Sequence, residues 1–284
     1  MTRSHQQMLP SVGLWGPNDP GPHIPTSRPQ EEQLTRQWGL MDVVFGVVLL
    51  IVSPLPLAAL WVAVQTAQLD DTITTEVILA SLANAVTSPE FLLLALAVQW
   101  CVLVAVPWNA TRRRGMRSMA RDFGLRITWS DVAWGVGLGL VLRVVDYGIG
   151  VAIAAAGVDP DSLSNSGILS SGTSATTTLL LFFAAGIAAP FAEEVFFRGL
   201  ALRAVFNRWR SPALAVAVSS VVFGLMHAQT TNGGVMQALY LVTLTGALGA
   251  ALGYAAIRTQ RLGVPIVAHM VFNSTAVALV ALSS

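Results

Sequence analysis

The sequence lacks lysine altogether, and it carries few charged side chains of any kind. Charged residues make up 11% of the 284 positions, apolar residues make up 54%, and the mean hydropathy is +0.64. Soluble domains contain roughly 25% charged residues. The stretch from Pro212 to Ile257 contains no Asp, Glu, Lys or Arg. These shortages exclude an ordinary soluble globule, because such a chain cannot cover its surface with charge, and they predict an integral membrane protein.

Cysteine is nearly absent as well. The single cysteine, Cys101, lies within an apolar run. An intrachain disulfide is therefore excluded, and cysteine use gives no information about the redox compartment.

Residues 1–38 differ in composition from the rest of the chain. They are rich in Pro, Gly, Gln and Ser and show no amphipathic period, which is typical of a disordered tail. No apolar segment follows a basic start, so the tail is not a secretory signal. We therefore expect a disordered N-terminal tail over 1–38 and a transmembrane domain over 39–284.

Seven apolar runs after the tail are candidates for membrane-spanning helices, which need about 20 residues. They cover 41–64, 89–108, 131–156, 174–208, 213–229, 235–257 and 264–282. We expect an all-α, polytopic helical bundle of about seven transmembrane helices. Pro54 and Pro56 should kink the first of these helices.

Arginines and acidic residues alternate between the loops that join these runs. Arginines concentrate in 109–130, 203–210 and 258–263, whereas 70–76 and 159–161 carry acidic residues and no arginine. Because arginine-rich loops stay in the cytoplasm, this pattern predicts a multi-pass plasma-membrane protein with a cytoplasmic N-terminus. We interpret the arginines of 109–130 as topology determinants beside anionic headgroups, and we expect no nucleic-acid partner.

Two groups of ionisable residues lie within the predicted spans, where charge is costly and often functional. Arg143 and Asp146 are three positions apart and can pair on one helix face, which favours a structural role. Glu193 and Glu194 are adjacent, and Arg198 follows Glu194 by four positions, so Glu194 and Arg198 should pair. Glu193 points about 100° away around the helix and has no helical partner. A desolvated carboxylate of this kind suits general base catalysis, and a structural Glu-Glu-Arg cluster is the alternative.

The third polar group consists of two histidines and an asparagine. His269 and Asn273 are four positions apart, so their side chains face one direction. A hairpin turn near residues 210–211 would place His227 at the height of the glutamates, each roughly 25 Å along its helix from the turn. Taken singly, such a histidine is more often a core residue than a catalyst, and such an asparagine often joins helices.

The chain resembles the CPBP family in three motifs that occur in the family's order. They read Glu193-Glu194-Val-Phe-Phe-Arg198, Phe223-Gly-Leu-Met-His227 and His269-Met-Val-Phe-Asn273. This family of CAAX proteases and bacteriocin-processing proteins is also called Abi and includes the type II CAAX prenyl endopeptidases. The resemblance covers residues 120–280.

The resemblance implies an all-helical intramembrane endopeptidase that acts on a membrane-embedded or lipidated, CAAX-type substrate. It implies that Glu193 activates a water molecule together with His227, and that His269 and Asn273 stabilise the oxyanion. Glu194 and Arg198 would hold the site. Peptide hydrolysis needs a base for water and donors for the oxyanion, and these residue types supply both.

Three alternatives remain open at this point. Glu193, His227 and His269 would give a zinc ion three ligands and leave one water position. The usual His-Glu-x-x-His signature is absent, and the set of residues covers both catalytic roles without an ion, so we expect no cofactor. An inactive membrane scaffold or immunity protein is the second alternative. A transport path is the third, although the broken helices and paired repeats typical of transporters are not evident.

Overall fold

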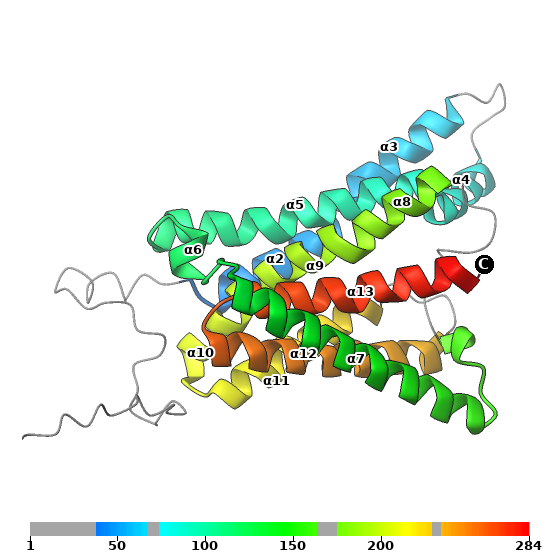
Figure 1. Ribbon diagram of the computed structural model, residues 1–284. Helices are drawn as coiled ribbons and strands as arrows, with labels where there is room; N and C mark the ends of the chain where they lie inside the picture. Colours follow the sequence, from blue (N-terminus) through cyan, green and yellow to red (C-terminus); the bar gives the residue numbers. More distant parts are fainter. Residues whose placement is uncertain (1–37, 68–73, 164–174, 229–233, 284) are drawn as a thin grey trace, which may run out of the picture.

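The structure is a computed structural model that describes residues 38–67, 74–163, 175–228 and 234–283. Every regular element within these ranges is a helix, so the predicted all-α fold is confirmed. The long helices run side by side along one common direction in a bundle (Figure 1). The predicted disordered tail lies outside the described residues, except for Trp38, which is buried.

The N-terminal half of the chain forms α2 (Leu40–Val52), α3 (Pro54–Thr66), α4 (Thr75–Thr87), α5 (Pro89–Arg114), α6 (Met119–Asp122), α7 (Trp129–Ala155) and η2 (Pro160–Leu163). The C-terminal half forms α8 (Ala175–Phe183), η4 (Ala184–Ala188), α9 (Ala189–Glu194), η5 (Val195–Ala201), α10 (Leu202–Trp209), α11 (Pro212–His227), α12 (Gly234–Thr259) and α13 (Gly263–Ser283). η4 and η5 are π-helical. Together with α8, α9 and α10 they form one continuous helical run that crosses the bundle diagonally (Figure 1).

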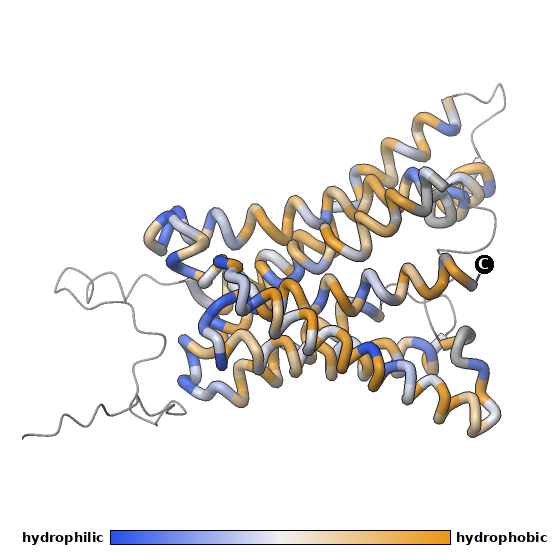
Figure 2. Tube along the Cα trace, in the orientation of Figure 1, coloured by the Kyte–Doolittle hydropathy of each residue, from blue (hydrophilic) through white to orange (hydrophobic). Residues whose placement is uncertain are grey.

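Within the described residues, five helical segments are long and apolar enough to cross a membrane. The first, Leu40–Thr66, comprises α2 and α3, and the others begin at Glu90, Trp129, Gly234 and Gly263. α11 is apolar but only 16 residues long, and π-helical turns divide the diagonal run. Apolar residues dominate the middle of the bundle, and hydrophilic ones gather largely toward its ends (Figure 2). The chain is a multi-pass membrane protein, whereas the number of seven spans stays a prediction.

The first apolar run is interrupted where its prolines begin. Proline has no N–H to continue the helical hydrogen bonds, and α2 ends at Val52 while α3 begins at Pro54. Ser53 between them keeps a helical backbone and donates its N–H to Leu49 O. α3 therefore follows α2 directly, with an interruption rather than a loop.

The hairpin expected near residues 210–211 joins α10 to α11. α10 ends at Trp209, and Arg210 adopts a left-handed conformation with φ of 54°. Ser211 then caps α11 by accepting a hydrogen bond from Leu214 N–H, and Pro212 occupies the first helical position, where no N–H is needed. The local sequence thus explains why the chain reverses here.

Glycines allow two pairs of helices to approach closely. α11 packs along α12, and α7 packs along α13. A Cβ atom at Gly224 of α11 would lie 2.5 Å from Val242 O of α12, and one at Gly139 of α7 would lie 2.6 Å from Ala268 O of α13. Larger residues would push these backbones apart, so the close packing of these helices depends on small residues at such positions.

The three arginine-rich segments meet at one end of the bundle. Arg203 of α10 donates to Phe123 O in the loop between α6 and α7, and Leu262 N–H in the α12–α13 turn donates to Gly124 O of that loop. Hydrophilic residues gather at this end, where α5, α6 and α10 lie (Figure 2). The segments therefore share one side, as expected, while their cytoplasmic orientation stays a prediction.

Candidate active site

The two adjacent glutamates end α9, and the π-helix η5 follows them directly. Every residue of η5 is buried. η5 packs against α2, α5, α11 and α12, while α9 packs against α5 and α13. π-helical turns often occur at functional sites. The glutamates therefore lie in the interior, between the N-terminal and the C-terminal helices.

Glu194 is completely buried and binds two partners through one oxygen. Arg198 Nη1 lies 2.9 Å from Glu194 Oε1, which confirms the pair expected from their spacing. Nδ1 of His269, on α13, lies 2.9 Å from the same oxygen. Because this oxygen already accepts from the guanidinium, it is an acceptor for the imidazole as well, so Nδ1 of His269 carries a proton. Glu194 thus joins η5 to α13.

Glu193 faces the other nitrogen of the same imidazole. Its Oε2 lies 3.8 Å from His269 Nε2, which is longer than a direct hydrogen bond. The side chain of Glu193 is 18% exposed, whereas those of Glu194 and His269 are 0% and 2% exposed. Glu193 is therefore the more accessible carboxylate, as a base that must meet a water molecule has to be.

Phe223 is the aromatic centre of the site, a role that sequence reasoning missed. Its ring centroid lies 4.4 Å from the guanidinium carbon of Arg198, 4.6 Å from the ring centroid of His227 and 5.8 Å from that of His269. Its position in the Phe223–His227 motif was the only feature of the sequence that could have indicated this role. Gly249 was missed as well: its carbonyl accepts a hydrogen bond from Arg198 Nη2 at 3.1 Å, and a Cβ there would lie 3.2 Å from that nitrogen.

His227 reaches the site from the end of α11. Its Nδ1 lies 2.9 Å from Phe223 O, four residues earlier in the same helix. A carbonyl can only accept, so this contact places the proton of a neutral imidazole on Nδ1 and leaves Nε2 unprotonated. In this tautomer Nε2 of His227 is a hydrogen-bond acceptor.

Asn273 follows His269 by one helical turn and joins α13 to η4. Its Nδ2 donates to Ala185 O at 2.9 Å. The next residue, Ser274, donates from Oγ to Gly186 O at 3.3 Å. These two bonds hold α13 beside the helical run that carries the glutamates.

The predicted Arg143–Asp146 pair is present and supports α13 from the opposite helix. Arg143 Nη1 pairs with Asp146, and its Nη2 donates to Phe272 O at 2.6 Å. The guanidinium carbon also lies 3.9 Å from the centre of the Phe272 ring. The pair thus braces the backbone beside Asn273, in agreement with a structural role.

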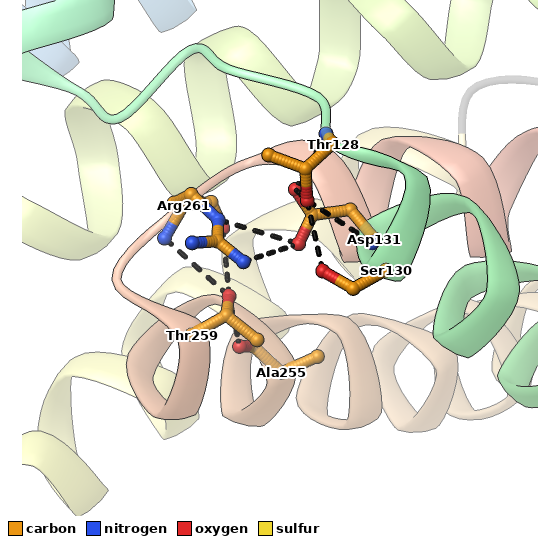
Figure 3. A network of polar contacts seen from close by, with 6 residues as sticks. All are labelled: Thr128, Ser130, Asp131, Ala255, Thr259 and Arg261. Carbon is orange, nitrogen blue, oxygen red and sulfur yellow. Dashed lines mark hydrogen bonds and ion pairs between the residues drawn. The ribbon is translucent and has the colours of Figure 1, made fainter.

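A second brace joins the start of α7 to the turn before α13 (Figure 3). Asp131 accepts from Arg261 Nη2 at 2.8 Å and from the N–H and hydroxyl of Thr128. The hydroxyl of Thr259 lies 2.9 Å from Ala255 O and 3.1 Å from Arg261 O, which closes the turn. Because α13 begins directly after this turn, the brace fixes where the histidine of α13 lies along the bundle.

Metal ligation was the alternative use of Glu193, His227 and His269. Across the part of the chain that the structure describes, no three His, Cys, Asp or Glu side chains are grouped so that they could hold a metal ion. Nδ1 of His269 is bound to Glu194, and Nδ1 of His227 is bound to Phe223 O. A histidine that binds zinc through one ring nitrogen usually donates from the other to a carboxylate or a carbonyl. These two bonds therefore do not argue against zinc, and the metal-free mechanism stays a prediction.

The structure thus brings Glu193, Glu194, Arg198 and His269 into one cluster. His227 adjoins this cluster through Phe223, and the asparagine of α13 lies one turn beyond. Their catalytic roles stay predictions.

Comparison with known proteins confirms the resemblance drawn from the three motifs. Residues 175–275 match the family model described as type II CAAX prenyl endopeptidase Rce1-like. The matched region contains all six predicted site residues. The chain is also 28% identical over 181 residues to a protein of Bacillus subtilis (strain 168) named "Putative membrane peptidase YdiL". That alignment covers 63% of this chain and 65% of the relative, so it spans less than two thirds of the relative's length. No solved structure matches the chain.

Proposed function

We propose that this chain, whose residues 175–275 match the type II CAAX prenyl endopeptidase family model, is an intramembrane endopeptidase. Its substrate would be a membrane-embedded or lipidated peptide or protein of the CAAX type. One observation carries the proposal: Glu193, the accessible carboxylate, faces an imidazole that a buried Glu–Arg pair holds from behind. This arrangement pairs a base with a hydrogen-bond donor inside an apolar bundle.

In the first step Glu193 acts as the general base. It takes a proton from a water molecule whose oxygen attacks the scissile carbonyl carbon, so that a C–O bond forms and the carbonyl oxygen becomes an oxyanion. Nε2 of His227 accepts a hydrogen bond from the other O–H of that water and helps to orient it. The bond from His227 Nδ1 to Phe223 O supports this role because it leaves Nε2 as the acceptor.

His269 and Asn273 would stabilise the oxyanion. For His269 this role requires a proton on Nε2, which an ionised Glu193 would attract across 3.8 Å. Once Glu193 has taken the proton from water, that attraction weakens and the N–H becomes available to the oxyanion. Donors placed where negative charge develops each contribute roughly 100- to 1000-fold to turnover.

The last step cleaves the peptide. The oxyanion reforms a carbonyl, the C–N bond breaks, and the departing amine takes the proton that Glu193 holds. Glu193 thereby returns to its ionised form and can act as the base again. Glu194 and Arg198 undergo no change and act by holding the imidazole.

Glu193→Gln tests the proposal directly. The variant keeps the size of the side chain but cannot take a proton, so we expect cleavage of membrane-tethered and prenylated peptides to fall to background. Glu90→Gln, at an exposed glutamate near the start of α5, is the matched control and should cleave normally. A folded Glu193→Gln protein that still cleaves would refute the mechanism. A wild-type protein that cleaves nothing in a broad panel would favour a scaffold or immunity role.

The same purified protein decides between the metal-free and the zinc mechanism. We expect no stoichiometric zinc in protein prepared without chelators. About one zinc per chain, lost together with activity on chelation and restored on readdition, would establish the metal mechanism instead.

A further inference from the structure

The backbone hydrogen bonds of η4 are shifted by one residue just before the glutamates. Ala189 N–H donates to Ala184 O, five residues back, whereas in an α-helix it would donate to Ala185 O. The next N–H in the π-helical pattern would come from residue 190, which is proline and has none. The helix therefore supplies Ala185 O with neither its α-helical nor its π-helical donor.

Two consecutive side chains of α13 donate hydrogen bonds to the two carbonyls that could accept from a backbone N–H at residue 190. In the π-helical pattern its N–H would go to Ala185 O, and that oxygen instead accepts from Asn273 Nδ2 at 2.9 Å. In the α-helical pattern it would go to Gly186 O, and that oxygen accepts from Ser274 Oγ at 3.3 Å. Backbone carbonyls inside an apolar bundle need a donor. The missing N–H of the proline is thus replaced by α13.

The close fit of the two helices depends on the same stretch. Pro190 is buried, and η4 packs against α13. A Cβ atom at Gly186 would lie 2.6 Å from Ser274 Oγ, so only glycine allows this approach. Pro190 and Gly186 together therefore allow the polar face of α13 to pack closely against η4 and to hydrogen-bond to its carbonyls.

We propose that Pro190 is a positioning residue for Asn273. It acts by keeping Ala185 O open as an acceptor for the asparagine amide. The inference rests on the proposed function, because Asn273 is assigned there to the oxyanion. An amide nitrogen carries two hydrogens. The bond to Ala185 O fixes the plane of the amide with one hydrogen and leaves the other for the substrate.

Pro190→Ala restores a backbone N–H that competes with the amide for Ala185 O. We expect kcat to fall by at least about tenfold, toward the 100- to 1000-fold cost of losing an oxyanion donor. KM should stay unchanged, because the donor acts in the transition state. Pro107→Ala is the matched control, since Pro107 also lies inside a helix, α5, but outside the cluster. Pro107→Ala should keep the wild-type kcat, and an unchanged kcat in Pro190→Ala would overturn the inference.

A double-mutant cycle separates positioning from a general structural effect. If Pro190 acts through Asn273, then Pro190→Ala should lower kcat no further once Asn273→Ala is present. Losses that multiply independently in the double variant would show that the proline does not act through the asparagine.

Lactic acid at position 190 isolates the N–H from the proline ring. This replacement, made by nonsense suppression in the full chain, puts an ester in the backbone, so that no N–H is present and no ring either. We expect it to retain kcat near that of wild type, which also keeps the inference testable if Pro190→Ala does not fold. A loss as large as that of Asn273→Ala would overturn it. The two proposals can fail separately. If the Glu193→Gln variant still cleaved peptide while the effects of Pro190→Ala and Asn273→Ala remained coupled, the general-base mechanism would be refuted but the positioning role of Pro190 would remain supported.

Discussion

Removing Arg198 should destabilise the protein more than removing any of its exposed arginines. Arg198→Met keeps an unbranched apolar side chain in place but leaves Glu194 without the guanidinium that lies 2.9 Å away. Both side chains are buried, with 1% and 0% exposed. The variant also loses the hydrogen bond to Gly249 O and the contact with the Phe223 ring. Breaking a buried pair on one side typically costs about 3–5 kcal/mol.

The expected change in thermal midpoint follows from that free energy. A domain of this size loses roughly 2–4 °C per kcal/mol, so we expect the midpoint in detergent to fall by about 6–20 °C. Arg114→Met is the matched control, because Arg114 pairs with Asp42 at 3.0 Å but is 38% exposed. Exposed pairs contribute about 0–1 kcal/mol, so the control should lose at most about 4 °C.

A third variant shows whether the cost arises from the orphaned carboxylate. In Arg198→Met/Glu194→Met both charges are gone, and replacing a whole buried pair by apolar residues is often close to neutral. The double variant should therefore recover much of the stability while remaining inactive, because His269 loses its partner. If Arg198→Met were as stable as wild type yet inactive, the holding role would be wrong, and Arg198 would belong with the reacting groups.

Two further predictions concern the end of the bundle where the arginines gather. Gly124→Ala should lower stability by more than about 1 kcal/mol, because φ is +67° and a Cβ would lie 2.4 Å from a backbone oxygen of the α12–α13 turn; thermal unfolding measures this. Gly137→Ala, where a Cβ meets nothing within 4 Å, should instead leave stability unchanged or raise it slightly. In a Cys101→Ser background, a cysteine at exposed Ala120 should resist membrane-impermeant thiol reagents in intact cells, and one at exposed Val158 should react. The reverse labelling pattern would overturn the predicted orientation.

Sequence reasoning succeeded where the deciding interactions are local. Too little charge to cover a soluble surface predicted a membrane protein, and side chains three or four positions apart on a helix predicted both the Arg143–Asp146 and the Glu194–Arg198 pairs. The interruption before Pro54 followed from the missing N–H of proline. These features depend only on residues within one or two helical turns of each other, so the sequence contains all of their causes.

The tertiary structure decided which distant residues meet. His269 lies 75 positions after Glu194, and only the packing of α13 beside α9 brings its imidazole between the two glutamates. The roles of Phe223 and Gly249 depend on α11 and α12 meeting η5. Helical periodicity assigns a residue to a face but does not identify the helix opposite that face. Such contacts depend on the packing of the whole bundle rather than on the spacing within one helix.

The π-helical turn before the glutamates is the clearest example of a feature that the sequence suggests only in part and that the packing of the helices determines. The sequence contains Pro190 and the Asn273–Ser274 pair, and each has an ordinary local reading: a helix-perturbing proline and polar residues on a span. The bond from Ala189 N–H to Ala184 O shows that the helix before Pro190 leaves carbonyls in need of donors. The position of α13 shows that Asn273 and Ser274 are the donors to these carbonyls. A backbone carbonyl released by the missing N–H of proline has no preferred partner in the sequence. The partner is determined by which polar side chain the fold brings within hydrogen-bonding distance.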